Sequence, residues 1–287
     1  MTRASMLRQK LLLGLNPTGF HRISYNEWGA EKANHTLICV HGLTRNSHDF
    51  DTLAQQLSSS TRVICPDIVG RGHSDRFLNA KHYGFPQYLS DMTALIARLN
   101  ITNVDWLGTS MGGLMGMFLA IQPNSPIKRL ILNDVGPYIP AAALRRIGRY
   151  AKAPPSFHTR KDAEAYIRAI YAPFGLLTDD QWLHITTHSI RQVGEENNYI
   201  LDYDPAVIQN LRFKIRSINL WAVWEKVKCP VLVIRGENSD ILTLKTLNQM
   251  QVTCPKLEVL TVKDAGHAPA LMDSAQIDVI EAWLARS

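Results

Sequence analysis

V-D-W-L-G-T-S-M-G-G, at residues 104–113, is the stretch that decides the fold. Its apolar beginning predicts a buried strand, and a helical pattern follows it. Between the two lies G-x-S-x-G, with Ser110 standing between Gly108 and Gly112. The glycines permit a turn so sharp that larger side chains would collide with neighbouring backbone, and this turn pushes the serine out above the sheet. The stretch therefore predicts an α/β protein that presents a reactive serine.

Other strand-like runs, with helical patterns between them, lie on both sides of this stretch. They are nearly continuous in Val, Ile and Leu, which is typical of parallel strands covered by helices on both faces. They comprise residues 35–40, 62–65, 127–132, 230–234 and 257–262. Ahead of them, residues 19–28 alternate weakly and indicate an antiparallel hairpin at an edge. After them, residues 274–285 predict a closing helix.

The alternation is interrupted between about residues 136 and 226, where we expect no strand. Several amphipathic helices with clear N-terminal signals replace it. These signals are Thr159 with Asp162, Thr178, and Asp204 before Pro205. The pattern predicts a core formed by residues 1–136 and 227–287, with a helical insertion at residues 137–226.

Composition excludes several classes of protein. A chain of 287 residues with 46% apolar residues is neither disordered nor fibrous. The net charge of +6 is dispersed along the chain, and no nucleic-acid-binding motif accompanies it, so we expect no nucleic-acid partner. No run approaches the ~20 apolar residues of a membrane span, so we expect no membrane insertion.

A cytoplasmic location is the expectation from two further features. The apolar stretch at residues 11–15 is too short for a signal peptide and lacks a small-residue cleavage site. The cysteines show no C-x-x-C spacing, and we interpret them as free, buried thiols of a reducing compartment. They are Cys39, Cys65, Cys229 and Cys254.

Chemistry at a serine hydroxyl requires a base and a group that orients the base. Among ten histidines, His267 lies in the loop between the last predicted strand and the closing helix. Loops of this kind converge at the carboxyl ends of parallel strands. His41 also follows a strand directly and is the competitor, but we interpret it as shaping the loop behind it.

The orienting acid is less clear from the sequence. The chain order of serine, acid and histidine selects carboxylates between the serine and the histidine that lie at strand ends. Asp240 closes the next-to-last predicted strand and is the first choice. Asp134 closes the strand before it and is the alternative acid. Glu237 and Asp264 are weaker candidates.

An oxyanion would require two backbone N–H donors, one after the nucleophile and one from an earlier loop. Met111 supplies the first, and Leu43 in H-G-L-T-R-N at residues 41–46 is the preferred second. The glycine-containing turn at residues 67–74 is interpreted as structural. Phosphate-binding loops and zinc-ligand spacings are absent from the sequence, so we expect no cofactor and no metal.

In the order of its motifs, the chain resembles the α/β-hydrolase superfamily from about residue 20 to the closing helix. These motifs are the H-G loop, the D-x-x-G-x-G-x-S turn, the G-x-S-x-G turn, an acid after the next-to-last strand and G-H after the last. The resemblance implies a mostly parallel eight-stranded sheet flanked by helices, with the insertion as a helical cap over the pocket. It also implies Ser110 as nucleophile, Asp240 as acid, His267 as base, and Leu43 with Met111 as oxyanion donors.

The resemblance implies a serine-dependent hydrolase of small to medium carboxylic esters that forms an acyl-enzyme, with the ester as its small-molecule partner. An alternative is an enol-lactone or carbon–carbon bond hydrolase of aromatic-degradation intermediates, whose carboxylate would be held by cap arginines such as Arg145, Arg146 or Arg149. Relatives that cleave carbon–carbon bonds usually have Trp after the histidine, whereas this chain has Ala268. A third hypothesis is a non-catalytic ligand receptor. The sequence leaves the oligomeric state open.

Overall fold

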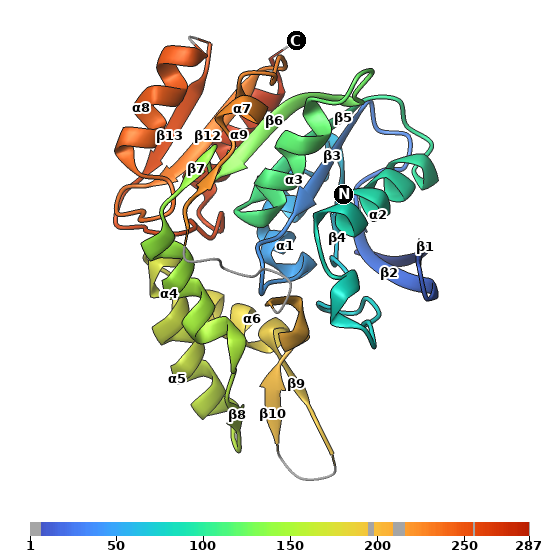
Figure 1. Ribbon diagram of the computed structural model, residues 1–287, viewed down its shortest axis with the longest axis vertical. Helices are drawn as coiled ribbons and strands as arrows, with labels where there is room; N and C mark the ends of the chain where they lie inside the picture. Colours follow the sequence, from blue (N-terminus) through green and yellow to red (C-terminus); the bar gives the residue numbers. More distant parts are fainter. Residues whose placement is uncertain (1–6, 195–197, 209–215, 255, 287) are drawn as a thin grey trace.

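An eight-stranded sheet forms the centre of the molecule (Figure 1). The computed structural model describes residues 7–194, 198–208, 216–254 and 256–286. In sheet order, the strands are β1 (Arg8–Asn16), β2 (Gly19–Trp28), β4 (Thr61–Pro66), β3 (His35–Val40), β5 (Val104–Thr109), β6 (Ile127–Asn133), β12 (Val231–Gly236) and β13 (Glu258–Val262). Strand β2 is antiparallel to both of its neighbours, and the strands from β4 to β13 pair in parallel. The predicted mostly parallel sheet is confirmed.

Helices cover both faces of this sheet. Successive side chains of a strand point to opposite faces, and because both sets are apolar in the central strands, each face needs a covering layer. In β3, Leu37 and Cys39 pack with the apolar residues of α1 (Asp51–Leu57) and α9 (Ser274–Leu284). Ile38 and Val40 of the same strand belong to the other core cluster. That cluster includes residues of α2 (Phe85–Arg98), α3 (Met111–Ala120), α7 (Trp221–Trp224) and α8 (Leu244–Thr253). Two apolar layers therefore sandwich the central strands.

Between β6 and β12 the chain leaves the sheet, and the helices between Ala141 and Ser189 lie at one end of it (Figure 1). These helices are α4 (Ala141–Lys152), α5 (Arg160–Tyr171), the 3₁₀ turn η3 (Ala172–Phe174) and α6 (Asp179–Ser189), and the 3₁₀ turn η4 (Pro205–Ile208) and α7 follow. Thr159 caps α5 by accepting from the N–H of Asp162, and Thr178 forms a capping box with Gln181 at α6. Asp204 accepts from the N–H of Ala206 at the start of η4. More than half of the described part of this segment is thus helical.

The expectation that this segment contains no strand was wrong. Strands β8 (Ser156–Phe157), β10 (Tyr199–Leu201) and β9 (Ile190–Gln192) form a small sheet, and β7 (Tyr138–Ile139) pairs with β11 (Ile218–Asn219). Each has only two or three residues, which is too short for an alternating pattern to appear in the sequence. Strands β9 and β10 pair as neighbours in the sequence, whereas β8 and the pair of β7 and β11 depend on partners far along the chain.

The four cysteines are free thiols in the structure. Cys39 and Cys65 are buried in the sheet, whereas Cys229 and Cys254 are only half-buried. Among residues 7–194, 198–208, 216–254 and 256–286, no helix combines the length and apolar character that a membrane crossing requires.

A buried carboxylate ties the edge hairpin to the rest of the sheet. The side chain of Glu27 in β2 is fully buried and lies 3.1 Å from Arg8, 3.0 Å from Lys10 and 3.2 Å from Arg62. Burial alone would raise the pKa of Glu27, but hydrogen bonds and charge from these cations outweigh it and lower the pKa. Because the folded-state pKa is the lower one, the network stabilises the fold above about pH 4.5 and loses its effect as the pH falls further.

We expect Glu27→Gln to lower the free energy of unfolding by about 2 kcal/mol at neutral pH, because it leaves the buried Arg62 without its counter-charge. The matched control is Glu31→Gln, since Glu31 is 61% exposed and contacts only Lys10 of the same cations. That variant should change stability by less than about 0.5 kcal/mol. Urea unfolding at pH 7 and at pH 4 measures both, and a Glu27→Gln effect that does not shrink at the lower pH would contradict the role of the ionised carboxylate.

Candidate active site

The turn between β5 and α3 holds Ser110 in a strained conformation. Its φ is 52° and its ψ is −110°, in a region that residues with a side chain rarely adopt. A Cβ on Gly112 would lie 2.0 Å from the carbonyl oxygen of Val40, and one on Gly108 would lie 2.2 Å from the backbone of Gly112. Both positions therefore need glycine, as the G-x-S-x-G pattern indicated.

Ser110, His267 and Asp134 lie in one hydrogen-bonded row. The Oγ of Ser110 is 3.0 Å from Nε2 of His267, and Nδ1 of the same ring is 2.7 Å from Oδ2 of Asp134. Because a carboxylate only accepts, Nδ1–H donates to Asp134, which leaves Nε2 free to accept from the serine hydroxyl. This is the geometry in which an imidazole can take a proton from a serine.

Asp134 is fully buried directly after β6, and donors from the end of β12 and from the loop after it hold its carboxylate. Oδ1 accepts from the backbone N–H of Gly236 at 2.9 Å, and Oδ2 accepts from the hydroxyl of Ser239 at 2.5 Å. With His267, three donors converge on this group. A buried carboxylate satisfied in this way is fixed in position.

The prediction that Asp240 orients the histidine is not what the structure shows. Asp240 is exposed and forms a bidentate ion pair with Arg146 of α4, with N–O distances of 2.7 and 2.8 Å. Burial would raise the pKa of Asp240, but the guanidinium of Arg146 outweighs it and lowers the pKa. The loop after β12 turns Ser239 inward and Asp240 outward, so the alternative acid, Asp134, occupies the place beside His267.

Asn133 connects the serine turn to the histidine loop. Its side-chain amide donates to the hydroxyl of Thr109 at 3.1 Å and to the backbone carbonyl of Pro269 at 2.9 Å. The backbone carbonyl of Asn133 accepts from the N–H of Ser110 at 3.0 Å. The sequence analysis did not select Asn133. Only its place beside Asp134 at a strand end could have drawn attention to it.

The inserted segment fixes the other side of the histidine loop. The N–H of Gly266 donates to the carbonyl of Pro173 at 2.7 Å, and the N–H of Ala270 donates to the carbonyl of Phe174 at 3.2 Å. These bonds to η3 flank His267 on both sides in the sequence. The imidazole is therefore held by backbone as well as by Asp134.

The two predicted oxyanion donors lie close to the serine. A Cβ on Gly42 would lie 3.8 Å from the Cβ of Ser110, which places the loop carrying Leu43 beside the nucleophile. In the described part of the chain, the N–H groups of Leu43 and Met111 donate to no protein acceptor. Both groups are thus available to an outside oxygen.

Arg71, which the sequence analysis treated as part of a structural turn, positions this loop. Its side chain is fully buried; Nε donates to the carbonyl of Leu43 at 2.8 Å, and another guanidinium nitrogen lies 3.7 Å from the sulfur of Met111. The same guanidinium also donates to the carbonyl of Val69 and to the hydroxyl of Tyr88. One buried side chain therefore contacts both residues that would supply the oxyanion donors.

His41, the competing histidine, is occupied elsewhere. Its Nδ1 donates to the carbonyl of Gly42 at 2.7 Å, and its Nε2 accepts from the N–H of Ile68 at 2.9 Å. Burial lowers its pKa to about 3, so the ring is neutral near pH 7. It shapes the loop at residues 41–46, as expected.

Comparisons with known proteins agree with this architecture. A family described as "alpha/beta hydrolase fold" matches residues 35–146. The chain is 42% identical over 273 residues to a 3-hydroxybutyrate-oligomer hydrolase of Cupriavidus necator. The aligned region covers 92% of this chain and 93% of that protein.

Two solved structures superpose over almost the whole chain. A protein from Rickettsia typhi has a TM-score of 0.91 at 38% identity, covering 98% of this chain and 99% of that one. An alpha/beta hydrolase from Novosphingobium aromaticivorans has a TM-score of 0.88 at 30% identity, covering 99% of both chains. With the sheet order and the strained serine turn, these relationships show that the chain belongs to the α/β-hydrolase superfamily.

Proposed function

We propose that this protein hydrolyses carboxylic esters through an acyl-enzyme on Ser110. The observation that carries the proposal is the row of Ser110, His267 and Asp134 at the strained turn. As Oγ attacks the ester carbonyl carbon, Nε2 of His267 takes the hydroxyl proton. The negative charge then develops on the carbonyl oxygen.

Two neighbouring groups stabilise this step. The N–H groups of Leu43 and Met111 donate to the developing oxyanion, and Asp134 keeps the imidazolium in place through Nδ1–H. The bond to the alcohol then breaks, and His267 gives its proton to the departing alkoxide. The result is an acyl group on Ser110 and a free alcohol.

Water completes the cycle by the same chemistry. His267 removes a proton from a water molecule, whose oxygen attacks the acyl carbon, and a second oxyanion forms against the same two N–H groups. When the bond to Oγ breaks, the proton on His267 returns to the serine. The acid product leaves with the oxygen of water.

Residues 137–226 form the cap over this site in our proposal. They anchor at η3, where Pro173 and Phe174 accept from the histidine loop, and at α4, where Arg146 pairs with Asp240. Both anchors lie next to residues of the site. A substrate would therefore bind between this segment and the carboxyl ends of the strands.

Short oligomers of hydroxy acids are the substrate class that we propose. The proposal rests on the similarity to the 3-hydroxybutyrate-oligomer hydrolase, which extends through residues 137–226 as well as through the sheet. A segment that covers the site is where substrate choice is made in such a fold.

Substitution of Ser110 tests the proposed nucleophile. We expect the purified protein to hydrolyse 3-hydroxybutyrate dimers and trimers or short acyl esters, and Ser110→Ala to lower kcat/KM by roughly a thousandfold or more. Ser156→Ala, an exposed serine of β8, is the matched control and should keep wild-type activity. Equal rates for wild type and Ser110→Ala would contradict the mechanism. Turnover limited to enol-lactones or carbon–carbon substrates would instead support the alternative activity.

Substitution of each carboxylate separates the two acids. Asp134→Asn should lower kcat by about 10⁴-fold, because the amide no longer holds the imidazole in the required tautomer. Asp240→Asn makes the same chemical change at the neighbouring loop and should alter kcat by less than about threefold, since an exposed ion pair contributes little. Steady-state kinetics on one ester measure both. A larger loss in Asp240→Asn than in Asp134→Asn would restore Asp240 as the acid.

A further inference from the structure

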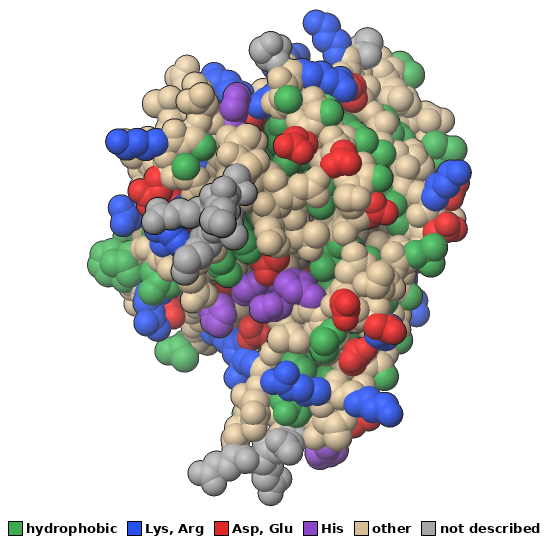
Figure 2. All heavy atoms as spheres, turned by 180° about the vertical axis from the view of Figure 1, so that it is seen from behind, with side chains coloured by type: hydrophobic (Ala, Val, Ile, Leu, Met, Phe, Trp, Pro, Cys, Tyr) green, Lys and Arg blue, Asp and Glu red, His purple; other side chains and the backbone are tan. Residues whose placement is uncertain are grey.

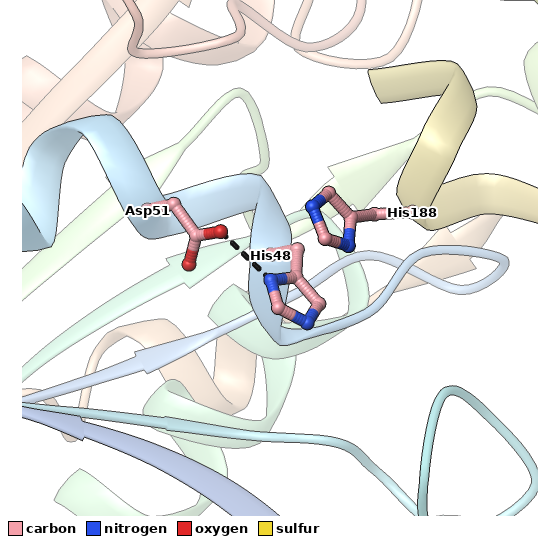
Figure 3. A group of neighbouring side chains, drawn as sticks. All are labelled: His48, Asp51 and His188. Carbon is pink, nitrogen blue, oxygen red and sulfur yellow. Dashed lines mark hydrogen bonds and ion pairs between the residues drawn. The ribbon is translucent and has the colours of Figure 1, made fainter. Parts of the chain in front are cut away.

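A second group of chemically capable side chains lies at the junction of the core and the inserted segment. His48 in η1 (Ser47–Phe50) and Asp51 at the start of α1 face His188 of α6 (Figure 3). One ligand atom from each lies within 4.8 Å of the other two. Nδ1 of His48 is 2.7 Å from Oδ2 of Asp51, and the rings of His48 and His188 stack with centroids 3.8 Å apart.

Two of these groups have binding capacity that the protein does not use. Oδ1 of Asp51 is buried and has no hydrogen-bond partner among the described residues. A buried carboxylate oxygen without a donor is costly, so its environment favours a cation. In the described part of the chain, the imidazole of His188 likewise makes no hydrogen bond.

His184 adds a further nitrogen on the same helix. It precedes His188 by one turn, so that the two rings share a face of α6 with centroids 4.6 Å apart. Its Nε2 lies 3.5 Å from Oδ2 of Asp51 and donates to the carbonyl of His48 at 3.1 Å. Figure 2 shows histidine side chains gathered together on this face of the molecule.

We propose that His48, Asp51 and His188 bind a divalent transition-metal ion, with Zn²⁺ as the best match. Two imidazoles and one carboxylate are zinc ligands, whereas Mg²⁺ and Ca²⁺ prefer all-oxygen sites. Zinc ligands at about 2.1 Å in a tetrahedron lie about 3.4 Å apart. In the present structure the ligand atoms lie within 4.8 Å of one another. Because the His48 and His188 rings stack with their planes 16° apart, one ring must rotate about its side-chain bonds to point its lone pair at the ion. Water or His184 completes the coordination.

The ion would join the inserted segment to the core. At present α6 is held here by the amide of Asn46, which donates to the carbonyl of His188 at 2.5 Å, and by Arg45, which donates to the hydroxyl of Ser189. A metal would add bonds from α1 and η1 to the same turn of α6. The site uses none of the residues proposed for ester hydrolysis. It departs from the expectation of no metal, which rested on spacing patterns between ligands close together in the sequence, because His48 and His188 are far apart along the chain.

The test is calorimetric titration of chelator-treated protein with Zn²⁺ at neutral pH. We expect one ion per chain, and at least a tenfold weaker affinity in His188→Gln and in Asp51→Asn, since each loses a ligand. His158→Gln, an exposed histidine of the same segment, is the control and should bind as wild type does. Saturating Zn²⁺ should also raise the wild-type Tm by about 5 °C.

Several results would overturn the proposal. Wild type that shows no saturable binding up to about 1 mM Zn²⁺ has no such site. Unchanged affinity in both ligand variants, or an equal loss in His158→Gln, would place the ion elsewhere. Binding abolished by thiol alkylation would assign it to the cysteines. Far-UV circular dichroism without metal checks the fold of each variant, and Asp51→Asn decides if His188→Gln does not fold.

Discussion

The site depends on how closely the first turn of α3 approaches the sheet. Gly112 has room for no side chain because the carbonyl of Val40 lies in the way, and the indole of Trp106 donates to the carbonyl of Gly112 at 3.0 Å. This approach forces Ser110 into its left-handed conformation, at a cost of about 1–3 kcal/mol that the buried core supports. The position of Ser110 and the strain of its backbone thus both follow from a single close packing contact.

Local patterns predicted the serine turn, the histidine and the sheet strands, because each is specified by residues close together in the sequence. The acid was different. Asp134 and Asp240 both follow strands, and both lie between the serine and the histidine in the chain. Which of the two carboxylates lies beside the imidazole is therefore determined by the tertiary arrangement. β6 lies next to β5, which places Asp134 beside Ser110, whereas the loop after β12 buries Ser239 and leaves Asp240 at the surface.

The inserted segment marks a second limit of prediction from sequence. Its helix caps could be predicted because a cap needs only a few consecutive residues. Several of its short strands and its contacts with the core, however, pair residues far apart along the chain. The contact between His48 and His188 is of this kind, as is the bond from Gly266 to Pro173. Spacing rules for metal ligands cannot detect a site that forms only when two parts of the fold dock.

The contacts between this segment and the core differ in kind around the site. Beside His267, they are backbone hydrogen bonds from Gly266 and Ala270 to η3, and Gly266 is buried. At α4, the pair of Arg146 and Asp240 has side chains that are 35% and 47% exposed, and such pairs contribute about 0–1 kcal/mol. The buried side chains of Leu144 and Ile147 in α4 belong to the same apolar cluster as the sheet residues, so burial of apolar surface contributes more to holding α4 than the ion pair does. Directional backbone bonds therefore fix the histidine loop, whereas non-directional apolar packing positions α4.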